Sequence, residues 1–214
     1  MAKLNFHNEL RNRPDLAVIA ELVERGHRVL DLGCGDGSFL KMLKNEHGAE
    51  VLGIELDPDL IAESIANGVP VVQMDLDDEL DFADNDSFDL VILSQTLQQT
   101  RRPDQLMRKI VRVGKMAAVS MLNFGYITCR AQLVFRGAMP RTREIPYQWY
   151  NTPNIHHATI GDFRRLCRHL GIRIIQEIPI GPSFPLLSAK WPNWFAVGCV
   201  FLLEKENGNH PSGF

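Results

Sequence analysis

The chain has 214 residues, enough for one sizeable domain with a buried core. Its 45% hydrophobic and 23% charged residues are typical of a soluble globular protein, and its net charge of -3 argues against a nucleic-acid-binding surface. The four cysteines lie far apart, without a C-x-x-C pair or histidines at metal-ligand spacing. We therefore expect reduced thiols, no metal site and a cytoplasmic protein. No apolar run is long enough to cross a bilayer, so we expect no membrane association.

The first half of the chain alternates helical and strand-like patterns. Pro14 opens a helix with apolar residues at helical spacing, and a strand is expected over Arg28–Leu32. Asp57 is expected to cap a later helix, with Pro58 at its first position. Four further strands are expected over 51–56, 69–74, 88–93 and 115–122. Strands that alternate with helices predict a parallel sheet with right-handed crossovers.

The pattern changes after residue 122. Residues 123–157 are rich in aromatic residues and prolines, and within them only Ile127–Arg136 has a helical pattern. We interpret 123–157 as a cap over the carboxyl ends of the strands; the alternative is a surface insertion packed around its own small core. Thr159 and Gly171 mark the start and end of another helix. Two last strands are expected over 172–178 and 195–203, and their proline-rich connection is too short for a crossover helix, which predicts an antiparallel pair.

Three glycines at every second position, Gly33, Gly35 and Gly37, follow the first strand. Glycine permits a sharp turn and lets a ligand lie against the backbone, as in the nucleotide crevice of a doubly wound sheet. A dinucleotide fingerprint would have its third glycine at Ser38, which disfavours a nicotinamide-dependent oxidoreductase. With Asp31 at its start, the motif D-x-G-x-G-x-G resembles the first motif of class I S-adenosylmethionine-dependent methyltransferases. The alternative is a tight turn that binds nothing.

Two more acidic residues lie at strand ends. Glu55 ends the second strand, where one carboxylate can accept hydrogen bonds from both hydroxyls of a ribose, and Leu56 beside it belongs to the same expected site. The alternative for Glu55 is a surface residue beside the Asp57 cap. Asp75 ends the third strand, where it can accept a hydrogen bond from an adenine amine while the backbone N–H of Leu76 donates to the ring. Most of the acidic run after Asp75 is expected to be solvated loop.

The end of the fourth strand, with Ser94 and Gln95, is where a methyltransferase places its reacting atoms. We assign Ser94 to the cofactor site; both residues are otherwise ordinary strand ends. Neither an Asn/Asp-Pro-Pro-aromatic motif nor a Pro-Cys nucleophile occurs, so no nucleic-acid base is expected as acceptor. Methyl transfer mainly requires positioning, and a base for it would have to be His156 or His157, each of which has a structural alternative. The catalytic residues stay unknown, and Cys34 is expected to pack rather than react.

Four stretches resemble the MetW family of methionine-biosynthesis proteins, namely VLDLGCGDG at 29–37, LSQTLQ at 93–98, NFG at 123–125 and PYxWYxTPNIH at 146–156. The resemblance runs from about residue 13 to residue 204. It implies a protein that binds S-adenosylmethionine or S-adenosylhomocysteine and associates with homoserine O-acyltransferase, which such proteins help to make active. No G-x-S-x-G nucleophile elbow occurs, so acyl transfer would belong to the partner. The alternative is a genuine methyltransferase that acts on a small molecule, so it stays open whether the chain is an enzyme.

We therefore predict an α/β, Rossmann-like class I methyltransferase fold: a seven-stranded, mostly parallel sheet with an antiparallel last strand, helices on both faces and a cap insertion. The whole chain is expected to form one domain. Within it, 14–122 is the ligand-binding core, 123–157 the cap, 158–204 the last helix and strand pair, and 205–214 a disordered tail. In the cap, we expect Phe124, Tyr126 or Trp149 to approach the ligand.

Overall fold

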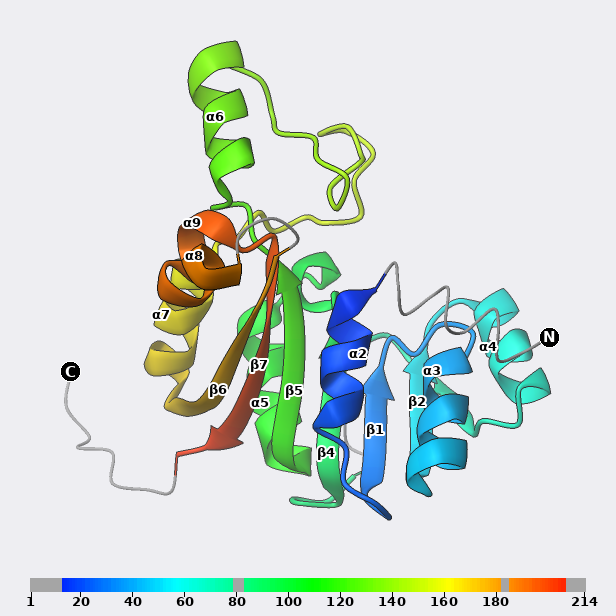
Figure 1. The fold of residues 1–214 in the computed structure, drawn as a ribbon. Helices are drawn as coiled ribbons and strands as arrows, with labels where there is room; N and C mark the ends of the chain where they lie inside the picture. Colours follow the sequence, from blue (N-terminus) through cyan, green and yellow to red (C-terminus); the bar gives the residue numbers. More distant parts are fainter. Residues whose placement is uncertain (1–12, 79–82, 182–184, 207–214) are drawn as a thin grey trace.

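The sheet has the predicted number of strands and the predicted direction of its last strand (Figure 1). The computed structural model describes residues 13–78, 83–181 and 185–206 and shows seven strands in the order β3-β2-β1-β4-β5-β7-β6. The pairs β3-β2, β2-β1, β1-β4 and β4-β5 are parallel, whereas β7 is antiparallel to both β5 and β6. The strands are β1 (Arg28–Leu32), β2 (Glu50–Glu55), β3 (Val71–Gln73), β4 (Phe88–Ser94), β5 (Gly114–Leu122), β6 (Ile172–Ile180) and β7 (Gly198–Lys205).

The helices begin at the residues that favour helix starts. Asp57 caps α4 by accepting a hydrogen bond of 2.9 Å from the N–H of Asp59, and Thr159 and Asp162 form a capping box at α7. The helices are α2 (Pro14–Glu21), α3 (Ser38–Met42), α4 (Pro58–Ala66), α5 (Pro103–Val113), α6 (Ile127–Arg136), α7 (Ile160–Leu170), α8 (Pro185–Lys190) and α9 (Pro192–Phe195). A π-helical turn, Leu43–His47, continues α3, and a 3-10 turn, Leu97–Gln99, follows β4. None of the helices in the described ranges is long and apolar enough to cross a membrane.

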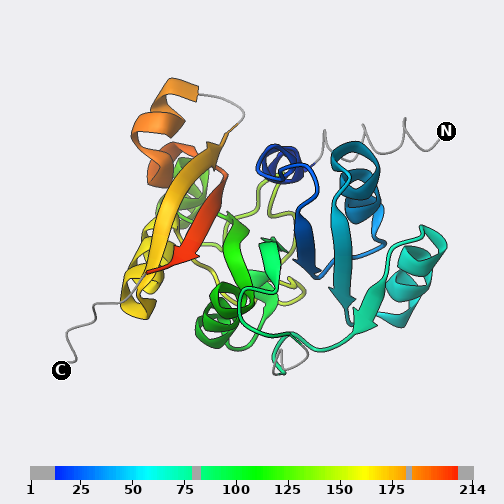
Figure 2. The same ribbon diagram turned by 90° about the horizontal axis from the view of Figure 1, so that it is seen from below.

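Two hydrophobic clusters cover the two faces of the sheet. Alternate residues of a strand point to opposite faces, so Leu90 and Ile92 of β4 pack in one cluster while Val91 and Leu93 pack in the other. The first cluster includes side chains of α2 and α3, and the second includes side chains of α5 and α7. Helices therefore lie on both faces of the sheet, as predicted (Figure 2).

Residues 123–157 lie beyond the carboxyl ends of the parallel strands, with α6 projecting away from the sheet (Figure 1). The first residues of this segment have a small core of their own, in which Cys129 and Ile145 pack with Leu122, Phe124 and Tyr126. The segment therefore combines both sequence-based interpretations, since it lies over the strand ends and also packs around its own core.

The structure corrects several boundaries. The connection between β6 and β7, expected to be irregular, contains the short helices α8 and α9, so β7 starts at Gly198 rather than at 195. Strand β3 spans only Val71–Gln73, rather than 69–74, and α2 ends at Glu21. The predicted tail 205–214 overlaps the end of β7 at Lys205, and residues 207–214 lie outside the described residues. Prolines at 185 and 192 explain the short helices, because proline is favoured at the first helical position.

Candidate functional site

The turn after β1 depends on its three glycines. Gly33, Gly35 and Gly37 have φ values of 83°, 59° and 72°, a backbone conformation that other residues rarely adopt. A Cβ on Gly33 would also lie 2.8 Å from the hydroxyl of Thr96, so this glycine lets the turn approach the end of β4 closely. The turn is held against β2, because the N–H groups of Gly33 and Cys34 donate hydrogen bonds of 2.8 and 3.0 Å to the carbonyl of Ile54.

Asp31 is buried under this turn with an unused acceptor. Its side chain lies at the end of β1 and is 3% exposed, and its Oδ1 has no hydrogen-bond partner in the described part of the chain. Burial raises the pKa of Asp31 to about 7; the nearby charge of Arg13 opposes this rise and that of Glu55 adds to it. A buried acceptor without a donor costs free energy, so this carboxyl has an acceptor atom to which a cationic or hydrogen-bonding group could bind.

Glu55 lies at the end of β2 and binds the glycine turn directly. Its Oε2 accepts a hydrogen bond of 2.9 Å from the N–H of Gly35, and its Oε1 accepts from the N–H groups of Leu56 and Asp57 at 2.7 and 3.1 Å. The side chain of Leu56 itself is 56% exposed. Each carboxylate oxygen can accept more than one hydrogen bond, so Glu55 keeps acceptor capacity at the edge of the sheet.

A cleft of about 270 Å³ lies between the glycine turn and the end of β4. It brings together four of the predicted cofactor residues, Asp31, Gly33, Gly35 and Ser94. The other predicted residues, Gly37, Glu55, Leu56, Asp75 and Leu76, do not line it, although Glu55 reaches it through its bond to Gly35.

Asp75 and Leu76 lie farther along the same edge of the sheet, after β3. Asp75 accepts a hydrogen bond of 3.0 Å from the N–H of Asp77, and it forms an ion pair of 3.4 Å with Arg101. Leu76 is half-buried and packs against the larger core cluster. The ion pair with Arg101 was not predicted from the sequence.

The residues that anchor Ser94 were not predicted from the sequence. Arg13 donates two hydrogen bonds of 2.9 Å to the carboxylate of Asp15 and a third to the hydroxyl of Ser94. The Asp15 carboxylate also accepts from the hydroxyls of Ser94 and Ser120, at 3.2 and 2.7 Å. Burial alone would raise the pKa of Asp15, but these donors and the charge of Arg13 hold it below its ordinary value. Arg13 is therefore held in place where it lines the cleft.

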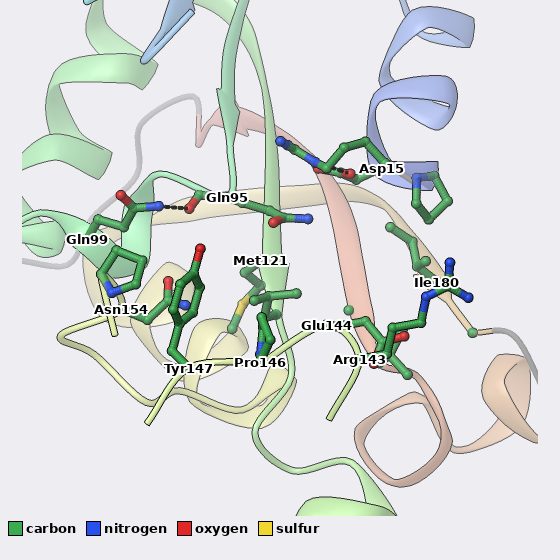
Figure 3. A pocket seen from close by; sticks show the side chains of 17 residues that line it. Asp15, Gln95, Gln99, Met121, Arg143, Glu144, Pro146, Tyr147, Asn154 and Ile180 are labelled. Carbon is green, nitrogen blue, oxygen red and sulfur yellow. Dashed lines mark hydrogen bonds and ion pairs between the residues drawn. The ribbon is translucent and has the colours of Figure 1, made fainter. Parts of the chain in front are cut away.

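A larger cavity of about 610 Å³ lies between the cap and the strand ends and shares Arg13 with the first cleft (Figure 3). Gln95, at the end of β4, lines it and has a φ of 58°, which is unusual for a residue other than glycine. The cap contributes Tyr147 and Asn154, and the apolar wall includes Met121.

The histidines and most cap aromatics lie elsewhere. Neither His156 nor His157 lines either cavity, and the ring of His157 packs 4.5 Å from that of Phe124. That Phe124, Tyr126 or Trp149 approaches the ligand stays a prediction; none of the three lines either of the two cavities described above, whereas Tyr147 lines the larger one. Helix α6 projects away from the sheet, and several aromatic side chains of residues 123–157, including those of Trp149 and Tyr150, are exposed to solvent.

Cys34, inside the glycine turn, is a buried thiol. Its Sγ occupies the space that a Cβ on Gly53 would need, and burial raises the pKa of the thiol to about 12. It packs between the turn and β2 in the neutral form, as expected. The described residues hold no group of three or more histidine, cysteine, aspartate or glutamate side chains that could bind a metal ion.

A family model described as methionine biosynthesis protein MetW matches residues 13–203 of the chain. The chain belongs to the MetW family. A relative of this MetW-family chain from Rhodopirellula baltica, a bifunctional methionine biosynthesis protein MetXA/MetW, is 33% identical over 200 residues. The match covers 88% of this chain and 32% of the relative, so the chain spans about a third of that protein's length.

Two further proteins resemble this MetW-family chain. The trans-aconitate 2-methyltransferase of Mycobacterium tuberculosis is 33% identical over 70 residues, which are 32% of this chain and 27% of that enzyme. An S-adenosylmethionine-dependent methyltransferase from Mesorhizobium loti superposes with a TM-score of 0.66 at 22% identity, over 90% of this chain and 96% of that one. The structural match shows the methyltransferase fold.

Proposed function

We propose that this MetW-family protein binds S-adenosylmethionine or S-adenosylhomocysteine and acts as a partner and regulator of homoserine O-acyltransferase in methionine biosynthesis. The relative from Rhodopirellula baltica carries this proposal, because its MetW part and a part named MetXA share one chain. We take the MetXA part to be the acyltransferase, in line with the partner that the sequence motifs imply. Joining two parts covalently keeps them at a high effective concentration, which favours proteins that work together.

The residues of the cleft fit the proposed cofactor. The unpartnered Oδ1 of Asp31 suits the α-ammonium of its amino-acid end, and the Nη1 of Arg13, which donates to no described residue, suits its carboxylate. Gly33 and Gly35 leave room for it against the backbone, and Glu55 has acceptor capacity for the ribose hydroxyls. S-adenosylmethionine would supply a methyl group on a sulfonium centre wherever transfer occurs.

The placement of the two histidines supports sensing rather than turnover. Neither His156 nor His157 lines either cavity, so neither is in place to take a proton from an acceptor. S-adenosylmethionine lies downstream of methionine, so a protein that binds it without consuming it would report the output of the pathway. The free and buried state of the four cysteines supports a cytoplasmic location.

A methyltransferase acting on a small molecule is the second candidate, and the larger cavity favours it. This cavity shares Arg13 with the cofactor cleft, so a molecule bound there would lie beside the reacting end of the cofactor. Release of S-adenosylhomocysteine in the presence of candidate small molecules would support this function, and its absence would favour sensing.

The partnership is tested by size-exclusion chromatography of the purified protein mixed with homoserine O-acyltransferase from the same organism. We expect co-elution in one peak whose mass equals that of a complex. Separate elution at micromolar concentrations, with and without S-adenosylmethionine, would contradict the proposed partnership.

A further inference from the structure

Exposed apolar side chains are concentrated in the cap rather than spread over the molecule. In the part of the chain that the structure describes, sixteen large hydrophobic side chains are exposed, and nine of them lie within residues 123–157. Three of the nine are consecutive at the end of α6, where Leu133, Val134 and Phe135 are 45%, 75% and 86% exposed. A contiguous group of exposed apolar side chains is unfavourable in water and usually marks a site of association with another molecule.

Helix α6 presents this apolar turn on more than one side. Figure 1 shows the helix projecting away from the sheet, and Cys129, near its start, is its one buried residue. Successive residues of a helix point about 100° apart, so the three apolar side chains of residues 133–135 together cover about 200° of the circumference. A flat surface such as a bilayer could cover only one side of this turn, whereas a groove in a protein could enclose it.

Hydrogen bonds hold the cap in shape around α6. The side chain of Gln132 in α6 donates to the carbonyl of Arg141 at 2.9 Å and accepts from the N–H of the same residue at 3.0 Å. The guanidinium of Arg141 donates two further bonds, of 3.1 and 2.9 Å, to the carbonyl of Pro146. At the start of the helix, the Cζ of Arg130 lies 4.1 Å from the ring centroid of Trp194 in α9. A surface that is held in this way loses little conformational freedom on association, which favours binding.

The cap also differs in charge from the rest of the chain. Residues 123–157 contain four arginines and a single acidic residue, Glu144, so this segment carries a net charge of +3 although the whole chain carries -3. None of the four arginines forms an ion pair with a residue of the described ranges. Like charges on two copies of the cap would repel each other, so the surface does not suit a second copy of the chain. It suits a partner whose apolar groove has an acidic rim.

We propose that the end of α6, residues 133–136, inserts into an apolar groove with an acidic rim on homoserine O-acyltransferase. This inference rests on the proposed function, which names the acyltransferase as partner. The relative from Rhodopirellula baltica, in which the MetW part shares one chain with a part named MetXA, favours a protein over a membrane as the occupant. An exposed ring beside an arginine, here Phe135 beside Arg136, suits an interface core, where aromatic residues and arginine are enriched. No residue of α6 lines either cavity, so this surface is separate from the cofactor cleft.

The test is the dissociation constant of the full chain and its variants for homoserine O-acyltransferase from the same organism, measured by biolayer interferometry. Phe135→Ser removes the most exposed side chain of α6, and Arg136→Glu reverses the adjacent charge. Ile65→Ser and Arg108→Glu are the matched controls, because these residues are exposed on other helices, α4 and α5. All four side chains are exposed, so we expect the variants to fold like the parent chain, which circular dichroism checks.

We expect Phe135→Ser and Arg136→Glu each to weaken binding about tenfold or more, while both controls bind like the parent chain. If the parent binds the acyltransferase and all four variants bind it equally well, the proposed surface is wrong although the partnership stands. If the parent does not bind, the partnership itself is contradicted and this inference falls with it.

The same variants separate two other occupants of the surface. Sedimentation with vesicles of phosphatidylglycerol and phosphatidylethanolamine in equal parts tests a bilayer, and the mass of the chain alone in sedimentation velocity tests a second copy. Suppose that Phe135→Ser abolished vesicle binding or dissociated a dimer, and yet bound the acyltransferase like the parent chain. The surface would then belong to the bilayer or to the second copy, and the proposal would be overturned.

Discussion

The backbone N–H of Gly35 donates a 2.9 Å hydrogen bond to the carboxylate of Glu55 and so joins the glycine turn to the end of β2. The other carboxylate oxygen is held by two further backbone N–H groups, those of Leu56 and Asp57. A side chain fixed by three donors loses little conformational freedom when a ligand binds, which makes the proposed ribose contact favourable.

Glu55→Ala should therefore weaken the binding of S-adenosylmethionine by about 1.5–3 kcal/mol, the range for hydrogen bonds to a charged group. Calorimetry of the purified protein measures this directly. Glu50→Ala is the matched control, because Glu50 begins the same strand at its other end and is exposed. Equal affinities of the Glu55 variant and the parent would remove Glu55 from the site.

Gly33→Ala should destabilise the fold more than Gly26→Ala. Both glycines have a similar positive φ, 83° and 78°, so both variants carry the backbone strain of about 1–2 kcal/mol. Only the Cβ at Gly33 meets another group, the hydroxyl of Thr96 at 2.8 Å, whereas nothing lies within 4 Å of a Cβ at Gly26. Urea unfolding would show this difference in midpoint, and equal losses would mean that the turn can move away from Thr96.

Asp31→Asn should stabilise the protein in the absence of ligand at pH 8 but not at pH 4. The pKa of Asp31 is about 7 in the folded state, against 3.8 for an unperturbed aspartate, so between these pH values the folded state binds more protons than the unfolded state. Stability from this group is thus complete below about pH 4 and is lost as the pH rises to 7. Urea midpoints of parent and variant across this range provide the test; parallel curves would contradict the raised pKa.

The same variant should bind S-adenosylmethionine more weakly, although it folds more stably. The proposed contact of the α-ammonium with the Asp31 carboxylate pairs a buried charge, and an amide cannot replace that charge. Such opposite effects on stability and binding are typical of a residue retained for function. Calorimetry at pH 8 that showed unchanged affinity would place the ammonium elsewhere.

S-adenosylmethionine should slow hydrogen exchange in the glycine turn and also in the cap residues that line the larger cavity, including Tyr147 and Asn154. The two cavities share Arg13, so a ligand held by this arginine links them. Mass spectrometry of exchanged peptides measures both regions in one experiment. Protection of the turn alone would mean that the cap is an insertion without a role in cofactor binding.

The topology and the helix caps were predictable because their causes are local. Asp57 and Thr159 stand directly before the helices they cap. The glycines of the turn occupy the positions with positive φ, so they indicate the turn directly in the sequence. The antiparallel direction of β7 followed from the length of its connection. These features depend on residues that are neighbours in the sequence.

The larger cavity was not predictable, because residues that are distant in the sequence line it. Arg13, Gln95 and Val197 all line it, although they lie far apart in the sequence. The left-handed conformation of Gln95 has no sequence signal, since glycine or asparagine usually marks such positions. Tyr147 lines the larger cavity and Trp149 does not. Which of these two aromatic side chains faces the cavity depends on the path of the chain after α6, which projects away from the sheet, and composition does not reveal that path.

The most direct test of the proposed function is the rate of homoserine O-acyltransferase with and without this protein, titrated with S-adenosylmethionine. We expect the protein to change the rate and the ligand to change it further, at higher ligand concentration for Glu55→Ala than for Glu50→Ala. A tenfold ligand effect requires about 1.4 kcal/mol of difference in ligand affinity between the free and complexed states. An acyltransferase rate that is the same with and without the protein, at every ligand concentration, would contradict the proposed partnership; a rate that responds to the protein but not to the ligand would contradict sensing alone.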